Sequence, residues 1–321
     1  MKRGPIYQRG YKPQLSGHET FPMRYGWLKK AYDRVAETEH KIDNRADCWG
    51  DEAIAIFGVG KNMVRAIRFW AKAFGVISGK TELPKSVATT EPGKLIFGNK
   101  GLDPYMEHSA TLWFFHWNLA ANPERTTWYW AFGYYPSPYF ERADMLKRLE
   151  RLSENLNWAG ASSTTLKKDI DVFIRTYASR PSRGRLMQDG AFECPLTELG
   201  LIKTVGKKDG FRFVRGPKPT LGMGVFTCAL LEFWKSYSST RATLSFEAIA
   251  HEPGSPGRVF LLDENDVIDR LVELGGFTNG AVRWSETAGL KQVIRTDKAN
   301  DLTALDLLNR DFVNGENREV A

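Results

Sequence analysis

The chain has 321 residues, of which 42% are hydrophobic and 12% aromatic, enough for packed cores and against a largely disordered protein. Its three cysteines form no CxxC pair, which excludes a zinc ribbon and argues against a disulfide-stapled secreted protein. No apolar run reaches the roughly 18 to 20 residues that span a bilayer, and the first residues form no signal-peptide core, so we expect a cytoplasmic protein.

The positive charge is confined to the first quarter of the chain. Residues 1–80 hold 15 Lys and Arg against 8 Asp and Glu, whereas the rest holds 30 of each, so the whole net charge of +7 lies in these 80 residues. A localised excess of this kind indicates a polyanionic partner. The alternative is a surface bias that serves no ligand.

Residues 1–82 are predicted to form a basic, helix-turn-helix-like DNA-binding domain. After an extended arm (1–15), the apolar spacing predicts helices over 21–39, 52–57 and 62–74, followed by a short strand or turn over 76–79. A short helix, a glycine turn and a basic helix are typical of a helix-turn-helix or winged-helix unit.

Residues 83–178 are predicted to form a helical, Trp-rich middle domain. Residues 111–120 are apolar on nearly every side, which predicts a buried central helix, and we expect His116 to be one of its hydrogen-bonded core residues. A charged amphipathic helix over 140–157 and a helix capped by Ser or Thr, starting within 162–169, are expected next.

Residues 179–321 are predicted to form a C-terminal winged-helix-like domain with an acidic tail. We expect turns and hairpins over 179–218, with strands near 199–203 and 211–215. Helices over 225–237, 245–250 and 263–274 then precede strands over 282–285 and 291–296. We place the turn 254–258 in a wing. The expected fold class is mainly α with short β-hairpin wings, in winged-helix or helix-turn-helix-like units around the Trp-rich middle domain.

The basic helix over 62–74, with Lys61 immediately before it, is the strongest indication of a DNA-binding surface in the sequence. On a helix, four of its cations fall within about 60° of one another; they are Lys61, Arg65, Arg68 and Lys72. Asn62 stands at the N-terminal end, where a recognition helix reaches bases. An ordinary solvated helix is the alternative, but such helices mix charge signs, and no acid occurs between Glu52 and Glu82. Arg24 and Arg258 complete the predicted DNA-binding residues.

The glycines before this helix do not form a phosphate-binding loop. That motif needs Gly where Ala55 stands and Ser or Thr where Asn62 stands. We therefore expect no ATP binding or hydrolysis.

Two short clusters are candidates for catalysis. His18 and Glu19 resemble the start of a zinc-protease motif that lacks its second His. Asp103 and Glu107, followed by His108, could hold a hard cation or move a proton. The alternative for the second cluster is a helix N-terminus with Asp103 as its cap. The catalytic candidates are His18, Glu19, Asp103 and Glu107, and the metal ligands are unknown.

Several motifs resemble one bacterial family, long catalogued as a domain of unknown function. They are residues 16–24, 27–30, 57–64 with Ile67 and Trp70, 103–105, 111–113 with His116 and Trp117, 195–201, and 255–260. The chain looks like the SspB-like members of this family, the DNA-nicking component of the Ssp single-strand DNA phosphorothioation system. The resemblance covers about residues 16–295.

The resemblance implies a DNA-binding protein that nicks one strand during phosphorothioate modification, an anti-phage defence. It also implies partners: DNA, a cysteine desulfurase, an ATP-pyrophosphatase sulfur transferase and a P-loop ATPase. A divalent metal (Mg or Mn) is compatible with nicking, and a homodimer remains open; no membrane partner is expected. The alternatives are a non-enzymatic DNA-recognition or scaffold subunit and a transcription regulator.

Overall fold

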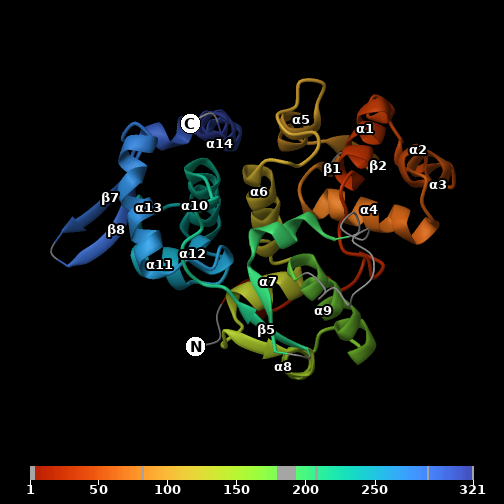
Figure 1. Ribbon diagram of the computed structural model, residues 1–321, viewed down its shortest axis with the longest axis horizontal. Coiled ribbons are helices and arrows are strands. Elements are labelled where there is room, and N and C mark those ends of the chain that lie inside the picture. The colour runs from red at the N-terminus through yellow and green to blue at the C-terminus, as the bar shows by residue number, and fades with distance from the viewer. Residues whose placement is uncertain (1–3, 81–82, 179–192, 207–208, 288, 320–321) are drawn as a thin grey trace. The chain divides into compact units, whose positions relative to one another are not determined.

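The structure is a computed structural model, and it describes residues 4–80, 83–178, 193–206, 209–287 and 289–319 (Figure 1). The chain is mainly helical with small antiparallel sheets, which confirms the coarse fold class. It divides into two compact units: Met1–Glu107, Glu124–Thr127 and Ser137–Arg212 form unit 1, and His108–Pro123, Trp128–Pro136 and Phe213–Ala321 form unit 2. The three consecutive domains expected from the sequence stay a prediction.

Unit 1 begins with a helical group around α4. The elements are α1 (Trp27–Thr38), α2 (Arg45–Trp49), α3 (Glu52–Phe57), α4 (Lys61–Ala73), β1 (Ile77–Lys80), β2 (Leu83–Thr89) and α5 (Glu91–Phe97), with β1 and β2 paired antiparallel. Helices α1, α2 and α3 all contact α4 (Figure 1). The helix expected from residue 21 begins only at Trp27, because Gly26 adopts a left-handed conformation (φ 76°) immediately before it.

The rest of unit 1 adds a sheet that the sequence did not predict in full. Its elements are β3 (Tyr139–Glu141), α8 (Arg142–Asn155), α9 (Ser163–Tyr177), the 3₁₀ helix η3 (Pro195–Leu199), β4 (Ile202–Val205) and β5 (Gly210–Phe213), and the strand order is β3-β5-β4. The helix expected from residue 140 begins two residues later, because Tyr139–Glu141 pair with β5. Ser162 caps α9 as predicted, its hydroxyl accepting the Thr165 N–H. The turns expected over 179–192 lie outside the described residues.

Unit 2 is built around buried helices. Its elements are α6 (Ser109–Ala120), most of α7 (Thr126–Gly133), α10 (Met223–Ser238), β6 (Thr243–Ser245), α11 (Phe246–His251), α12 (Pro256–Val259), α13 (Glu264–Phe277), β7 (Val282–Thr287), β8 (Leu290–Arg295), the 3₁₀ helix η4 (Asp297–Asp301) and α14 (Ala304–Glu319). The strand order is β6-β8-β7, and β7 and β8 extend as a hairpin (Figure 1).

Two expectations about unit 2 have clear outcomes. Helix α6 is buried on every side, and the His116 Nε2 atom lies 2.8 Å from the Val259 carbonyl oxygen, so the buried central helix and its hydrogen-bonded histidine are confirmed. The placement of residues 254–258 in a wing is wrong, because Ser255 caps the short helix α12 with its hydroxyl. Throughout the described residues, every helix is too short or too polar to cross a membrane.

Candidate nucleic-acid interface

Helix α4 has one buried face and one cationic face. Val64, Ile67 and Trp70 are buried, and the Trp70 indole N–H donates to the Phe21 carbonyl oxygen at 2.9 Å. On the other side, the Lys61 side chain is 65% exposed and the Arg65 side chain 58% exposed. The outer face is therefore open to a ligand, while the inner face fixes the helix on the core.

The remaining cations of α4 are half-buried and repel one another. Burial and then the nearby Arg45 lower the pKa of Arg68. Burial, followed by Arg68, Arg45 and Arg125, lowers the pKa of Lys72. Arg45 and Arg125 thus belong to the same positive region, which no local sequence pattern indicates. A bound anion would relieve this repulsion.

Asn62 is exposed at the second position of α4, and its contact with bases stays a prediction. The predicted cation Arg24 is half-buried, and its guanidinium lies 5.8 Å from the Phe21 ring centroid and 5.5 Å from that of Trp27. Arg24 therefore packs on aromatic rings within unit 1.

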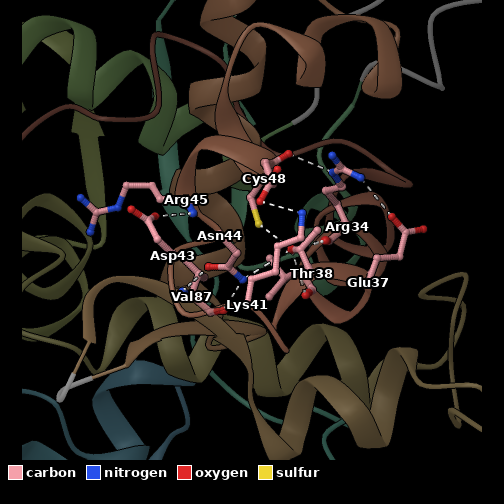
Figure 2. Close-up of polar contacts among 11 residues, drawn as sticks. Arg34, Glu37, Thr38, Lys41, Asp43, Asn44, Arg45, Cys48 and Val87 are labelled. Carbon is pink, nitrogen blue, oxygen red and sulfur yellow. Dashed lines mark hydrogen bonds and ion pairs between the residues drawn. The ribbon is translucent and has the colours of Figure 1, made fainter.

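The backbone next to Arg45 is fixed by the buried side-chain amide of Asn44. Asn44 is fully buried; its amide donates to the Val87 carbonyl and its oxygen accepts the Val87 N–H, both at 2.8 Å. Beside it, the Thr38 hydroxyl lies 3.1 Å from the Cys48 sulfur. Figure 2 shows the Arg45 guanidinium pointing away from this cluster. Because the cluster joins the start of α2 to β2, it fixes the backbone from which Arg45 extends.

Carboxylates near the cationic face form only long, exposed contacts. The Lys61 Nζ atom lies 3.7 Å from Asp51 Oδ1, and the Arg65 Nη1 atom lies 3.9 Å from Glu19 Oε1. Exposed pairs of this kind contribute little to stability. A phosphate can therefore replace these carboxylates at small cost.

The loop of residues 16–20 is anchored by Asp169 of α9. His18 is 1% exposed; its Nε2 atom lies 2.7 Å from Asp169 Oδ1, and its Nδ1 accepts the Thr20 N–H at 3.1 Å. Since Nδ1 accepts, Nε2 carries the proton and donates to Asp169. Asp169 also accepts the Ser16 N–H at 2.9 Å. Both ring nitrogens of His18 are engaged, which favours a structural role over proton transfer.

The same loop packs against α4. Gly17 has φ 98°, and a Cβ atom there would lie 2.8 Å from Cδ2 of Phe69, so only glycine fits. The His18 ring meets Phe69 edge-on at 5.6 Å. The structure therefore brings the His18–Glu19 motif and the cationic face together, and Glu19 lies beside Arg65.

The second predicted cluster has a different local structure. Asp103 is 5% exposed, and its Oδ1 accepts the Glu107 N–H at 2.8 Å. The helix expected to begin at Asp103 is wrong: Met106 is left-handed (φ 61°), and the next helix, α6, starts at Ser109 with His108 as its cap. Asp103 therefore closes a turn.

Arg258 belongs to unit 2 and donates from Nη2 to the carbonyl oxygens of Gly133 and Tyr135, at 2.9 and 3.5 Å. Burial lowers its pKa to about 10. Among the described residues, no group of three or more His, Cys, Asp or Glu side chains could hold a metal ion, so the acidic candidates do not fit a metal cage.

Comparisons with known proteins agree over almost the whole chain. A family model described as "Protein of unknown function (DUF4007)" matches residues 15–312. A solved structure described as "SspB crystal structure" is 29% identical with a TM-score of 0.79, covering 94% of this chain and 88% of that chain. One described as "Magnesium ion-bound SspB crystal structure" is 28% identical, with the same TM-score and coverage. No curated protein matches.

Proposed function

The chain belongs to the DUF4007 family and is SspB-like, and from this premise we propose that it binds DNA through α4 and nicks one strand within the Ssp phosphorothioation system. Its partners would be DNA and the other phosphorothioation proteins, namely the cysteine desulfurase, the ATP-pyrophosphatase sulfur transferase and the P-loop ATPase. A homodimer belongs to the same proposal.

The cationic face of α4 carries the proposal for DNA. Four cations on successive turns lie about 5–6 Å apart, a spacing at which side chains can contact a phosphate backbone. Arg45 and Arg125 add to the same positive region, as their effect on Lys72 indicates. The exposed Asn62 stands where a recognition helix meets bases.

Strand topology supports winged-helix units. In unit 1 the β1–β2 hairpin follows α4 directly. In unit 2, β6, α11, the short α12, α13, β7 and β8 follow one another with the strand order β6-β8-β7, an arrangement in which α13 takes the recognition position. Helix α13 carries Glu264, Asp266, Asp269 and Glu273 against the single cation Arg270. Its charge is unsuited to phosphate, so we place the DNA contact at α4.

For nicking, the cations would stabilise the charge that develops on the attacked phosphate. Glu19 is the acidic candidate with a side chain beside them, and we propose that it accepts a proton from the attacking water. A non-enzymatic DNA-recognition or scaffold subunit is the second candidate, favoured because His18 and Asp103 both use their polar atoms within the fold.

The first prediction tests DNA binding. Replacing Arg65 and Arg68 with Ala should weaken binding by about 1 kcal/mol or more per lost contact and flatten the salt dependence by about one unit per lost phosphate. The control is Lys147→Ala with Arg151→Ala, which removes two exposed cations from the mixed-charge helix α8. Anisotropy titrations with duplex DNA at several salt concentrations measure both. Equal slopes for the wild type and the Arg65/Arg68 variant would contradict the interface.

The second prediction separates the two candidate functions. Purified protein is incubated with supercoiled plasmid, with and without magnesium or manganese. We expect Glu19→Gln to abolish nicking while retaining DNA affinity, because a base acts on the transition state. We expect Asp103→Asn to lower the melting temperature and keep the rate per folded molecule, and Glu107→Gln to keep both. Absence of nicking by the wild type in every condition supports the non-enzymatic subunit; nicking by Glu19→Gln excludes Glu19 as the base.

A further inference from the structure

Arg125 is a buried arginine with neutral partners. It is 7% exposed, its Nη1 donates to the Gln14 side-chain oxygen, and its guanidinium carbon lies 5.1 Å from the Phe69 ring centroid. Within the described residues no ion pair joins it to a carboxylate. Burial lowers the pKa of Arg125, and the negative charge of the neighbouring Glu124 partly offsets this effect. Its Nε atom is buried without a hydrogen bond. Its positive charge therefore has no hydrogen-bonded carboxylate among the described residues to neutralise it.

A second buried arginine of the chain provides a comparison. The Arg270 side chain is 11% exposed, and its guanidinium lies 5.6 Å from the Phe226 ring centroid. Arg270, however, has Asp266 at 3.6 Å and donates to the Leu221 carbonyl at 2.9 Å. Both arginines stack on a phenylalanine, but among the described residues only Arg270 forms an ion pair with a carboxylate.

Arg125 stands at the cationic face of α4. Phe69, on which it stacks, follows Arg65 by four residues and precedes Lys72 by three, so all three side chains share one side of the helix. Arg125 is among the cations that lower the pKa of Lys72, after burial, Arg68 and Arg45. The buried guanidinium thus lies against the ring that stands between Arg65 and Lys72 along the helix.

The segment Glu124–Thr127 is fixed by hydrogen bonds that do not involve Arg125. Thr126 Oγ1 lies 2.8 Å from the Tyr11 hydroxyl and accepts the Gln14 N–H at 2.9 Å. The Thr127 hydroxyl donates to Asp169. Since these contacts hold the segment, the positive charge of Arg125 is not needed to position it, and burying a charge opposes folding.

We propose that Arg125 is a buried cation of the DNA-binding face, whose charge stabilises a backbone phosphate bound between Arg65 and Lys72 without contacting it directly. The proposal rests on the proposed function and names a determinant of its site. Poorly screened by water, a buried charge acts more strongly on a neighbouring phosphate than an exposed one does.

The test compares Arg125→Gln, Arg125→Lys and Arg270→Gln in the full chain, by duplex-DNA anisotropy titrations over a salt series and by melting temperature. Arg125→Gln should bind about three- to tenfold more weakly, with a salt slope smaller by up to about one unit and a melting temperature unchanged or raised. Arg125→Lys keeps the charge and should bind within about twofold of the wild type. Arg270→Gln should melt at a lower temperature and bind DNA with unchanged affinity per folded molecule.

The outcomes separate this proposal from the proposed function. If Arg125→Gln binds like the wild type while the Arg65/Arg68 variant binds weakly, Arg125 is structural and the α4 interface stands. If neither variant binds more weakly, the interface itself is wrong. Should Arg125→Gln fail to fold, Arg125→Lys decides: wild-type affinity supports a role of charge, and an affinity lowered tenfold or more overturns it.

Discussion

At the scale of single residues, the site depends on partners that are remote in sequence. Asp169 lies in α9, whose sequence is amphipathic, and its neighbours in the sequence do not indicate that its side chain is buried. Its hydrogen-bond partners His18 and Thr127 lie 151 and 42 residues away, and its 1% exposure follows from them. Arg125 was missed for the same reason. The His18–Glu19 motif was recognisable from the sequence, but the engagement of both His18 nitrogens was not.

His116 provides a pH-dependent prediction. Burial lowers its pKa from 6.5 to about 4, partly offset by its hydrogen bond to Val259. Between these values the unfolded chain binds a proton that the folded chain does not. The free energy of unfolding should therefore fall by about 3 kcal/mol as the pH drops from 6.5 to 4, and change no further through this residue at lower pH.

Urea unfolding at pH 7 and pH 4.5 measures this effect. His116→Gln keeps a donor for the Val259 carbonyl but cannot titrate, so it should lose this part of the pH dependence. An equally steep loss of stability in the wild type and in His116→Gln would assign the dependence to other groups.

At the scale of elements, helices marked by a clear run or spacing of apolar residues were predicted well. Helix α3 was predicted with its observed ends, and α4 and α6 within one or two residues, because their burial pattern is already present in the apolar spacing. The errors lie at the start of α1 and in elements of only three or four residues. Strand β3 exists only because β5 pairs with it, and α12 forms only where Ser255 caps it. Such short elements have no period to detect.

Helix α14 gives a prediction at this scale. Asp311 is 7% exposed and accepts the Gly224 and Val225 N–H groups, both at 2.7 Å, at the N-terminus of α10, whose own N-cap is Gly222. Asp311→Ala should therefore destabilise the protein by about 2 kcal/mol, because two buried donors lose a charged acceptor.

The control is Asp306→Ala, which removes an exposed carboxylate from the same helix and should change stability by less than about 0.5 kcal/mol. Denaturant unfolding of the two variants measures the difference. Similar stabilities for both would mean that the Asp311 contacts add nothing to the fold.

At the scale of the whole molecule, the mainly helical class and the concentration of positive charge in the first 80 residues could be predicted, since both are properties of composition and local pattern. The interleaving of the two units could not. Segment Glu124–Thr127 belongs to unit 1 although the residues on both sides belong to unit 2. This membership follows from contacts such as Arg125 with Phe69, which no local pattern encodes.

That interleaving has a consequence for synthesis on the ribosome. Unit 1 is complete only at Arg212, more than a hundred residues after α4 and the rest of Met1–Glu107 have been made. At about 5–20 residues per second, the delay is roughly 5–20 seconds. Until residue 169 is made, the nascent chain carries the cations of α4 without Asp169, which holds the 16–20 loop beside them. The cationic helix can thus form early, while the loop beside it is anchored only late in translation.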